Sequence, residues 1–260
     1  SDSTLVIGNS GSSGDFLGIS SGSAYGGYVS IASDASGSAL NAVADGNKLT
    51  VTSGGTVTTT GNLVGGWAKT QGTGTALASG NTLQIGGVTT LSSGGQFIGG
   101  MAGAYHGAVA EENKLIINDS SESPLTLNNS AGNVGGIVFV GDGTSAGSGG
   151  ASGEYRAEGN LISGSNISVA GDAPAKNQFV GGWVTVSGLE TNHKIKTLSA
   201  TGNTVDLTNL TLGAADSKST DGVVGHIVAN KVVYSKNAVG TKQVNGKVNL
   251  IKANGSADTG

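Results

Sequence analysis

A pair of glycines flanked by apolar residues returns six times along this chain and constrains the fold more than any other feature. The pattern is an apolar residue, two glycines, a large apolar residue and a small one. Copies begin at Tyr25, Val64, Ile98, Val134, Val180 and, with His226 in the place of the second glycine, Val224. Successive copies are 39, 34, 36, 46 and 44 residues apart. Such a period indicates a fold built from repeated units.

A second mark alternates with the glycine pairs. It is an asparagine followed by alternating apolar residues, as in Asn81-Thr82-Leu83-Gln84-Ile85. The asparagines are Asn47, Asn81, Asn113, Asn160 and Asn203, and the last copy is degenerate at Gly246. Two interpretations stay open: the asparagines stack as an internal amide ladder, or they occupy corners with left-handed backbone.

The apolar residues alternate with a period of two over three to five positions, which predicts short strands. With 48 glycines in 260 residues, helices are disfavoured. A propeller needs four good strands per repeat and an even period, and a sandwich gives no reason for copies. We therefore predict an all-β fold, a single-stranded right-handed parallel β-helix (β-solenoid), in which length variation goes into loops.

With roughly 18 to 25 residues per coil, each repeat would make two coils, giving roughly 11–13 coils and a rod of about 50 to 60 Å. The predicted organisation is an N-terminal capping coil at residues 1–24, about six two-coil repeats at 25–251 and a polar tail at 252–260.

Composition excludes several classes. There is no cysteine, so thiolate metal sites and disulfides are absent. The net charge of −4 and the single arginine, Arg156, argue against nucleic-acid binding. No apolar run is long enough for a membrane helix. The 36% of hydrophobic residues argues against a disordered linker.

The motifs that could carry catalysis are weak. Gly18-Ile19-Ser20-Ser21-Gly22 fits an esterase pattern, but a chain this rich in Gly and Ser produces such a match by chance. Glu111-Glu112 should form a solvated corner rather than converge. The remaining candidates, none at metal-ligand spacing, are His106, His193, His226 and the pair Asp119 and Glu122. We expect no enzyme activity, no metal and no cofactor.

One repeat position collects large side chains: Tyr28, Trp67, Met101, Ile137, Trp183 and Ile227. Replacement by Met and Ile favours a core stack. If the column faced outward, its rings would suit sugar stacking or a partner protein. A long loop is expected from Gly141 to Gly153, continuing through Glu154, Tyr155 and Arg156.

The alternation of apolar-Gly-Gly-aromatic with Gly-Asn-x-Leu-x-Ile resembles the passenger region of large bacterial autotransporter adhesins. Val64-Gly65-Gly66-Trp67 with Gly80-Asn81-Thr82-Leu83-Gln84-Ile85 carries this resemblance, as does Val180-Gly181-Gly182-Trp183 with Gly202-Asn203-Thr204-Val205-Asp206-Leu207. The resemblance implies a right-handed parallel β-helix that is secreted across the outer membrane and displayed on the cell surface. The signal and the membrane barrel of that family are not in this sequence, so we expect a processed or excised passenger, or a free-standing solenoid.

The expected function is adhesion or self-association, without catalysis. The partner would be a host surface protein, a glycan or another copy of the chain. Two alternatives stay open: a structural subunit of an extracellular filament, and a polysaccharide-degrading β-helix enzyme. An ice-binding surface would need threonines in every coil, whereas they cluster at Thr56 to Thr60.

Overall fold

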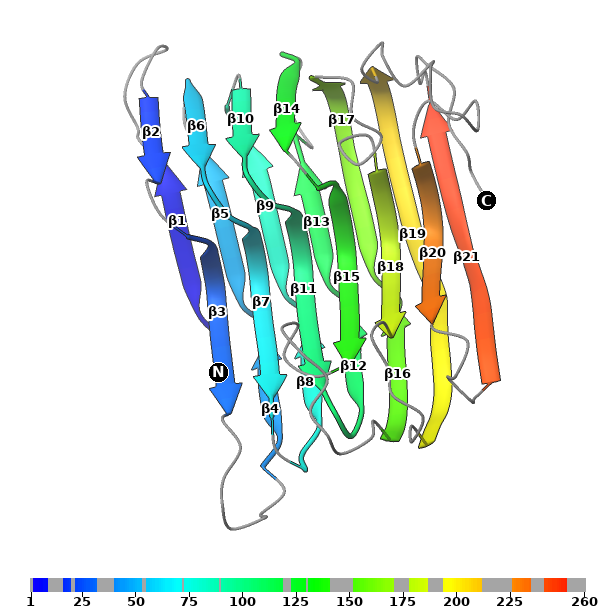
Figure 1. Cartoon of the computed structure of the whole chain (residues 1–260). Coiled ribbons are helices and arrows are strands. Elements are labelled where there is room, and N and C mark those ends of the chain that lie inside the picture. The colour runs from blue at the N-terminus through cyan, green and yellow to red at the C-terminus, as the bar shows by residue number, and fades with distance from the viewer. Residues whose placement is uncertain are drawn as a thin grey trace.

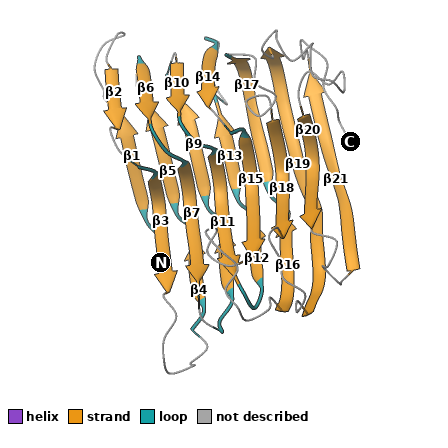
Figure 2. Ribbon diagram, viewed as in Figure 1, coloured by secondary structure: helices purple, strands orange, loops and turns teal. Residues whose placement is uncertain are grey.

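The structure is a computed structural model, and it describes residues 2–8, 16–19, 22–31, 40–52, 55–71, 73–88, 90–118, 123–129, 131–140, 152–170, 178–186, 194–211, 226–234 and 241–251. All regular structure in these ranges is β-strand, as Figure 2 shows. Every pairing between neighbouring strands is parallel, and the strands stack side by side from β1 to β21 (Figure 1). Within the described residues no helix is long and apolar enough to span a membrane.

One sheet has six strands, each about eight or nine residues long. They are β3 (Ala24–Ile31), β7 (Leu63–Thr70), β11 (Phe97–Ala104), β15 (Asn133–Val140), β18 (Gln178–Val186) and β20 (His226–Tyr234). All five glycine pairs lie in this sheet, one in each of its first five strands.

The second sheet has 15 strands and is made of three ladders that bend into one another. The first ladder contains β1 (Thr4–Gly8), β5 (Lys48–Thr52), β9 (Thr82–Gly86), β13 (Lys114–Ile117) and β17 (Leu161–Val169). The second contains β4 (Ala42–Asp45), β8 (Ala76–Ser79), β12 (Ala108–Glu111) and β16 (Ser152–Glu158). The third contains β2 (Phe16–Ile19), β6 (Thr56–Thr59), β10 (Thr90–Ser93) and β14 (Leu125–Asn129). The long strands β19 (Lys194–Thr211) and β21 (Thr241–Ile251) extend these ladders at the C-terminal end.

The register shows that each repeat makes one coil. Leu49 pairs with Leu83, and Leu83 pairs with Leu115, so stacked residues are one full repeat apart. The chain is therefore all-β with stacked parallel coils, an arrangement consistent with a β-solenoid. The prediction of 11–13 coils was wrong. It divided each repeat into two coils, whereas one coil holds all four strands of a repeat, such as β4 to β7. The longest ladder has seven rungs, which gives a height of roughly 29 Å instead of 50 to 60 Å.

Tight corners join the second ladder to the first. The corner residue has positive φ in five successive coils, and it is Gly46, Gly80, Glu112, Gly159 or Gly202. Glu112 adopts φ 55° there and is exposed, while Glu111 ends the preceding strand. As expected, this acidic pair lies at a solvent-facing corner.

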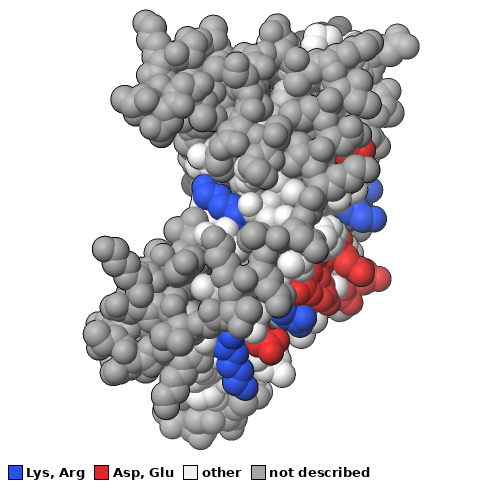
Figure 3. Space-filling view, turned by 90° about the vertical axis from the view of Figure 1, so that its right-hand side faces the viewer, with Lys and Arg blue, Asp and Glu red and all other residues white. Residues whose placement is uncertain are grey.

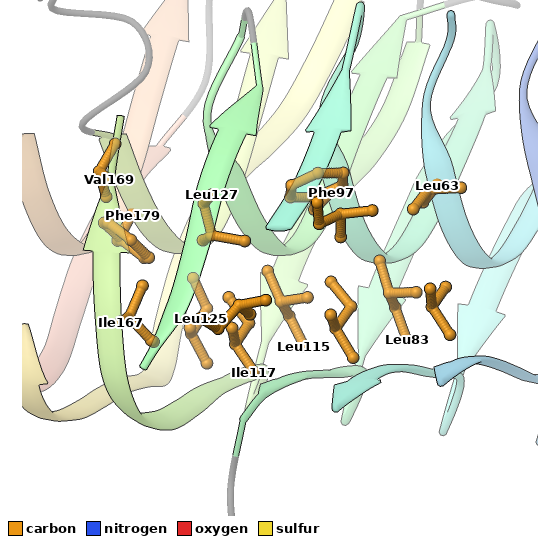
Figure 4. Close-up of a cluster of buried hydrophobic side chains, with 14 of the residues drawn as sticks. Leu63, Leu83, Phe97, Leu115, Ile117, Leu125, Leu127, Ile167, Val169 and Phe179 are labelled. Carbon is orange, nitrogen blue, oxygen red and sulfur yellow. The ribbon is translucent and has the colours of Figure 1, made fainter. Parts of the chain in front are cut away.

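The interior between the two sheets has two apolar compartments. The leucine compartment holds large side chains, including Leu83, Phe97 and Leu115, which Figure 4 shows packed together. The alanine compartment lies under the second ladder and is lined mainly by small residues: Ala42, Ala44, Ala68, Ala76, Ala78, Ala102, Ala104, Ala108 and Ala110.

The sixth glycine-pair copy lies four residues later than the sequence pattern suggested. Val180 pairs with Val228, Gly182 with Asn230 and Trp183 with Lys231. The copy is thus Val228-Ala229-Asn230-Lys231-Val232, and His226 pairs with Gln178 instead of occupying a glycine position. Ile227 does not belong to the aromatic column, because it is buried in the leucine compartment.

Other expectations have mixed outcomes. Residues 141–151 of the predicted loop lie outside the described residues, as do Ser20, Ser21, Asp119, Glu122, His193 and the tail at 252–260. The continuation of that loop through Glu154, Tyr155 and Arg156 was wrong, since these residues form the middle of β16. Tyr155 points inward and is fully buried, which explains why a large aromatic interrupts a run of small residues.

Candidate functional site

Of the two interpretations of the repeated asparagines, the structure shows the internal amide ladder. We call Asn47, Asn81, Asn113, Asn160 and Asn203 the asparagine spine; all five are buried. Each of the first four donates a hydrogen bond from Nδ2 to Oδ1 of the next, at 2.9 to 3.0 Å. Nδ2 of each of the last four also donates to the carbonyl of an alanine in the preceding coil, at 2.8 or 2.9 Å. Every amide is therefore paired inside the core, which removes the cost of burying it.

The glycine pairs of the six-stranded sheet pack against the asparagine spine. A Cβ on Gly66 would overlap the Asn81 side chain, and Gly100 stands in the same relation to Asn113. A Cβ on Gly65 would overlap the carbonyl oxygen of Gly99 in the next coil. Both glycines of a pair thus bring the six-stranded sheet against the spine, and the two sequence marks alternate because each coil needs one of each.

The spine changes at both ends. At the first coil, Ser3 Oγ lies 2.6 Å from both Asn47 Oδ1 and the carbonyl oxygen of Gly26, so its single proton is donated to one of these two acceptors at a time. At the last coil, Asn203 pairs along the ladder with Gly246, which has no side chain. The amide comes instead from Asn230 of the opposite sheet, whose Oδ1 accepts from Asn203 Nδ2 at 2.6 Å. Asparagine and glycine have exchanged sides in this coil.

The candidate functional surface lies on the outer face of the six-stranded sheet. We call it the outer ribbon, made of Tyr25, Tyr28, Trp67, Lys69, Met101, Ile137, Phe139, Trp183 and Lys231. Its apolar members form a cluster separate from the two interior compartments. Of the two interpretations of this column, the outward direction holds, although Met101 and Ile137 are buried there at 8% and 6% exposure, as the core interpretation favoured. Two consecutive glycines both face the spine, so Val64 and Trp67 on either side of them both face outward.

The rings of the outer ribbon contact one another across coils. Centroids are 5.2 Å apart for Tyr25 and Tyr28, 5.5 Å for Tyr25 and Trp67, and 5.1 Å for Tyr28 and Trp67. The Trp67 ring also meets Phe139 edge-on at 6.5 Å. Tyr28 is 47% exposed, and Trp67 and Trp183 are partly exposed. Such contacts fix the rings in place before any partner arrives.

Two lysines lie over these rings. Lys69 Nζ is 5.2 Å from the Trp67 centroid and 5.7 Å from that of Tyr28. Lys231 Nζ is 4.1 Å from the centroid of Trp183, its ladder neighbour. Both ion pairs recorded among the described residues involve Arg156, so neither lysine has a carboxylate partner there. Half-burial lowers the pKa of Lys231, because it disfavours the charged ammonium.

The outer face of the second ladder has the opposite character, and we call it the acidic face. Its outward carboxylates are Asp45, Glu111, Glu112, Glu154 and Glu158. Arg156 pairs with two of them, at 3.6 Å to Glu154 and 3.3 Å to Glu158. Figure 3, a view onto one end of the stack, shows acidic side chains gathered into one patch. By contrast, the six strands of the other sheet contain no Asp or Glu.

The acidic face contains a hollow of about 460 Å³. Leu77, Val109, Glu111, Arg156 and Lys196 contribute to its lining. His106, the one candidate histidine with a described side chain, also lines it and lies 2.8 Å from Ser152 Oγ through Nδ1. Within the described ranges no three His or acidic side chains are grouped so as to hold a metal ion.

Comparison with known proteins gives no relative: no protein-family model matches the chain, and neither a curated protein nor a solved structure is significantly similar to it.

Proposed function

We propose that this chain is a non-catalytic extracellular binding protein that mediates adhesion or self-association through a rigid stack of coils. The observation that carries the proposal is the outer ribbon, a row of aromatic, aliphatic and lysine side chains on the outer face of the six-stranded parallel sheet. Tyrosine and tryptophan dominate protein-binding surfaces, because they bury much area with few rotatable bonds. Rows of this kind on a stiff support suit binding rather than turnover.

The proposal extends to the origin of the chain. We propose that it is the passenger of a bacterial autotransporter, displayed on the cell surface after secretion across the outer membrane. We further propose that the coils wind right-handed as one single-stranded β-helix. Connections between parallel strands of one sheet are right-handed in about 98% of cases, which supports this handedness.

A filament subunit is the second candidate function. The two ends of the stack support it, because β3 and β20 are edge strands of the six-stranded sheet with one side unpaired by described strands. Parallel edges of this kind are complementary head to tail. The polysaccharide-degrading alternative gains no support from Glu154 and Glu158, since both pair with Arg156.

The test of adhesion is a binding screen of the purified chain against host-matrix proteins, glycans and itself. Both tryptophans of the sequence lie on the outer ribbon, so tryptophan fluorescence reports occupancy of this surface directly. We expect the double variant W67A/K69Q to lose binding at least tenfold. The control is Lys114→Gln, an exposed lysine of the first ladder. No retention on any partner and no self-association would contradict the proposal.

A further inference from the structure

We propose that the outer ribbon of one copy docks on the acidic face of a second copy, so that the proteins associate side by side. The inference rests on the proposed function and names a partner for the same surface. Its occupant is a second copy because one chain carries both complementary halves.

Charge supports this pairing first. The outer ribbon offers Lys69 and Lys231, and the six strands beneath it contain no carboxylate. The acidic face offers Asp45 and Glu111, neither of which has an ion pair among the described residues. Opposite potentials on two surfaces guide encounter and fix orientation, although each exposed pair adds little affinity.

Shape and apolar area point the same way. On the acidic face Val43, Leu77 and Val109 pair across neighbouring strands and form an outward apolar row. Asp45 and Glu111 form an acidic row two residues further along the same strands. On the outer ribbon Trp67 and Lys69 have the same spacing of two residues along the strand. An aromatic row can therefore meet an apolar row while Lys69 meets a carboxylate; Lys231 stands in the aromatic row itself, next to Trp183.

The hollow on the acidic face accepts a projecting side chain. It has a volume of about 460 Å³ and lies where Leu77 and Val109 meet Glu111. Tyr28 is the most exposed ring of the outer ribbon, at 47%. We assign Tyr28 as the ring that enters the hollow of the neighbouring copy, where its hydroxyl finds charged groups.

The sheet sets an upper limit on the contact area. Six strands of about eight residues form a face of roughly 24 by 26 Å, or about 620 Å². Met101, Ile137 and Phe139 are only 6 to 8% exposed, so the contact rests on Tyr25, Tyr28, Trp67, Trp183 and the two lysines and is smaller than the roughly 800 Å² per partner of a standard interface. Because the two faces belong to different sheets, every docked copy leaves one ribbon and one acidic face free. The association is open-ended.

The experiment is sedimentation velocity on the full chain over a range of concentration, at low and high salt. We expect wild type to associate, with at least a threefold weaker association constant in 0.5 M salt than at about 0.05 M, because salt screens exposed charges. Lys69→Glu and the double variant D45K/E111K should each associate at least tenfold more weakly. Mixed together, these two variants should re-form hetero-complexes.

The matched control is Lys114→Glu, which changes net charge as Lys69→Glu does but lies on the first ladder; it should associate like wild type. Circular dichroism checks that each variant is folded, and Tyr28→Ala gives an independent variant without a charge change. A monomeric wild type, or failure of the charge-swapped mixture, would overturn the inference. Equal association of all variants would assign self-association to the coil ends and overturn it as well.

Binding of an acidic polysaccharide, polygalacturonate for example, by a monomeric chain would replace the second copy with a glycan as occupant. That result overturns the inference and leaves the proposed adhesion standing. Absence of both self-association and glycan or matrix binding contradicts the proposed function itself.

Discussion

The leucine and alanine compartments lie on either side of the asparagine spine and solve the packing problem differently. In the leucine compartment the first ladder, the third ladder and the six-stranded sheet face one another, and large side chains such as Leu83 and Leu115 fill the space. In the alanine compartment the second ladder approaches the six-stranded sheet closely, so that Ala78 and Ala102 already fill it. One coil therefore has a thick side and a thin side, and the spine with its glycine pairs separates them.

Two positions on the thin side carry larger side chains toward the C-terminal end of the stack. The position of Ala108 is taken by Tyr155 and then by Leu198 in the following coils, and that of Ala102 by Val138. The Tyr155 hydroxyl donates to the carbonyls of Tyr105 at 2.8 Å and Ala104 at 3.1 Å, and burial raises the pKa of this phenol. Larger side chains thus take the place of alanines in the later coils.

The glycine pairs at the boundary between the two compartments should be the positions most sensitive to substitution. A Cβ on Gly99 would overlap the carbonyl oxygen of Gly135 and lie 2.8 Å from the Lys114 carbonyl. Because both neighbours are backbone, Gly99→Ala should lower the free energy of unfolding by about 4 kcal/mol. Urea unfolding measures it. The control is Gly86→Ala, which meets no atom within 4 Å and should change stability by less than about 1 kcal/mol. Equal effects would refute the close approach.

The spine should come next. Asn113→Leu keeps the approximate volume but removes the acceptor of Asn81 N and Nδ2 and the donor to Ala78 O. Each unsatisfied buried group costs roughly 1–3 kcal/mol, so we expect a loss of about 3.5 kcal/mol. Thermal unfolding followed by circular dichroism would show it. Lys114→Leu on the exposed neighbouring position should stay within about 0.5 kcal/mol, and a similar loss there would argue against a role for the amides.

Truncation should distinguish the compartments. Leu83→Ala leaves a cavity on the thick side and should cost about 3 kcal/mol. On the thin side Ala78→Gly should cost only about 1 kcal/mol, because little volume is lost. The two variants are compared in one urea series, and equal losses would mean that both sides are equally deep.

Enlarging a buried side chain should destabilise the thin side, where truncation costs little. Ala78→Val adds volume where the sheets are close and should cost about 2 kcal/mol. The adjacent Ser79→Val points outward and serves as its control, with an expected change below about 0.5 kcal/mol. If Ala78→Val were neutral by differential scanning calorimetry, the thin side would have to contain free space.

The exchange of asparagine and glycine in the last coil predicts that Asn230 and Gly246 are energetically coupled. Asn230→Gly removes the acceptor of Asn203, and Gly246→Asn alone adds an amide where Asn230 already occupies the space. The double variant restores the pattern of the earlier coils, so it should be more stable than the sum of the single losses predicts. We expect a coupling energy of about 1 kcal/mol in a double-mutant cycle. An additive result would show that the two positions do not interact.

The sequence predicted the strands and the parallel stacking, because alternation and repeated residue types record them directly, and it offered the asparagine ladder as one of two interpretations. It did not predict the coil size, since a period of 34 to 46 residues does not say how many strands share it. The sixth copy was misplaced because Asn230 stands where earlier coils have glycine.

The sequence predicted only part of the candidate site. The rings of Trp67 and Trp183 were recognised as one column, but its direction stayed open because Met101 and Ile137 replace the rings in two coils; both are buried even though the column lies on the outer side of the sheet. Lys69 and Lys231 gave no signal of their own: one follows the tryptophan by two residues, and the other takes the column position in the exchanged copy. Their relation to the rings appears only after the coils are stacked.

The asparagine spine also has a polarity. Its carboxamides all orient alike, each giving its hydrogen toward the C-terminal side. Turning one amide around would set two NH₂ groups against each other on one side and two oxygens on the other, and reversing the whole row would set the amide oxygens against the alanine carbonyls. Aligned dipoles of this kind polarise one another in a medium of low dielectric constant. The coils are thereby held in one direction as well as in one register.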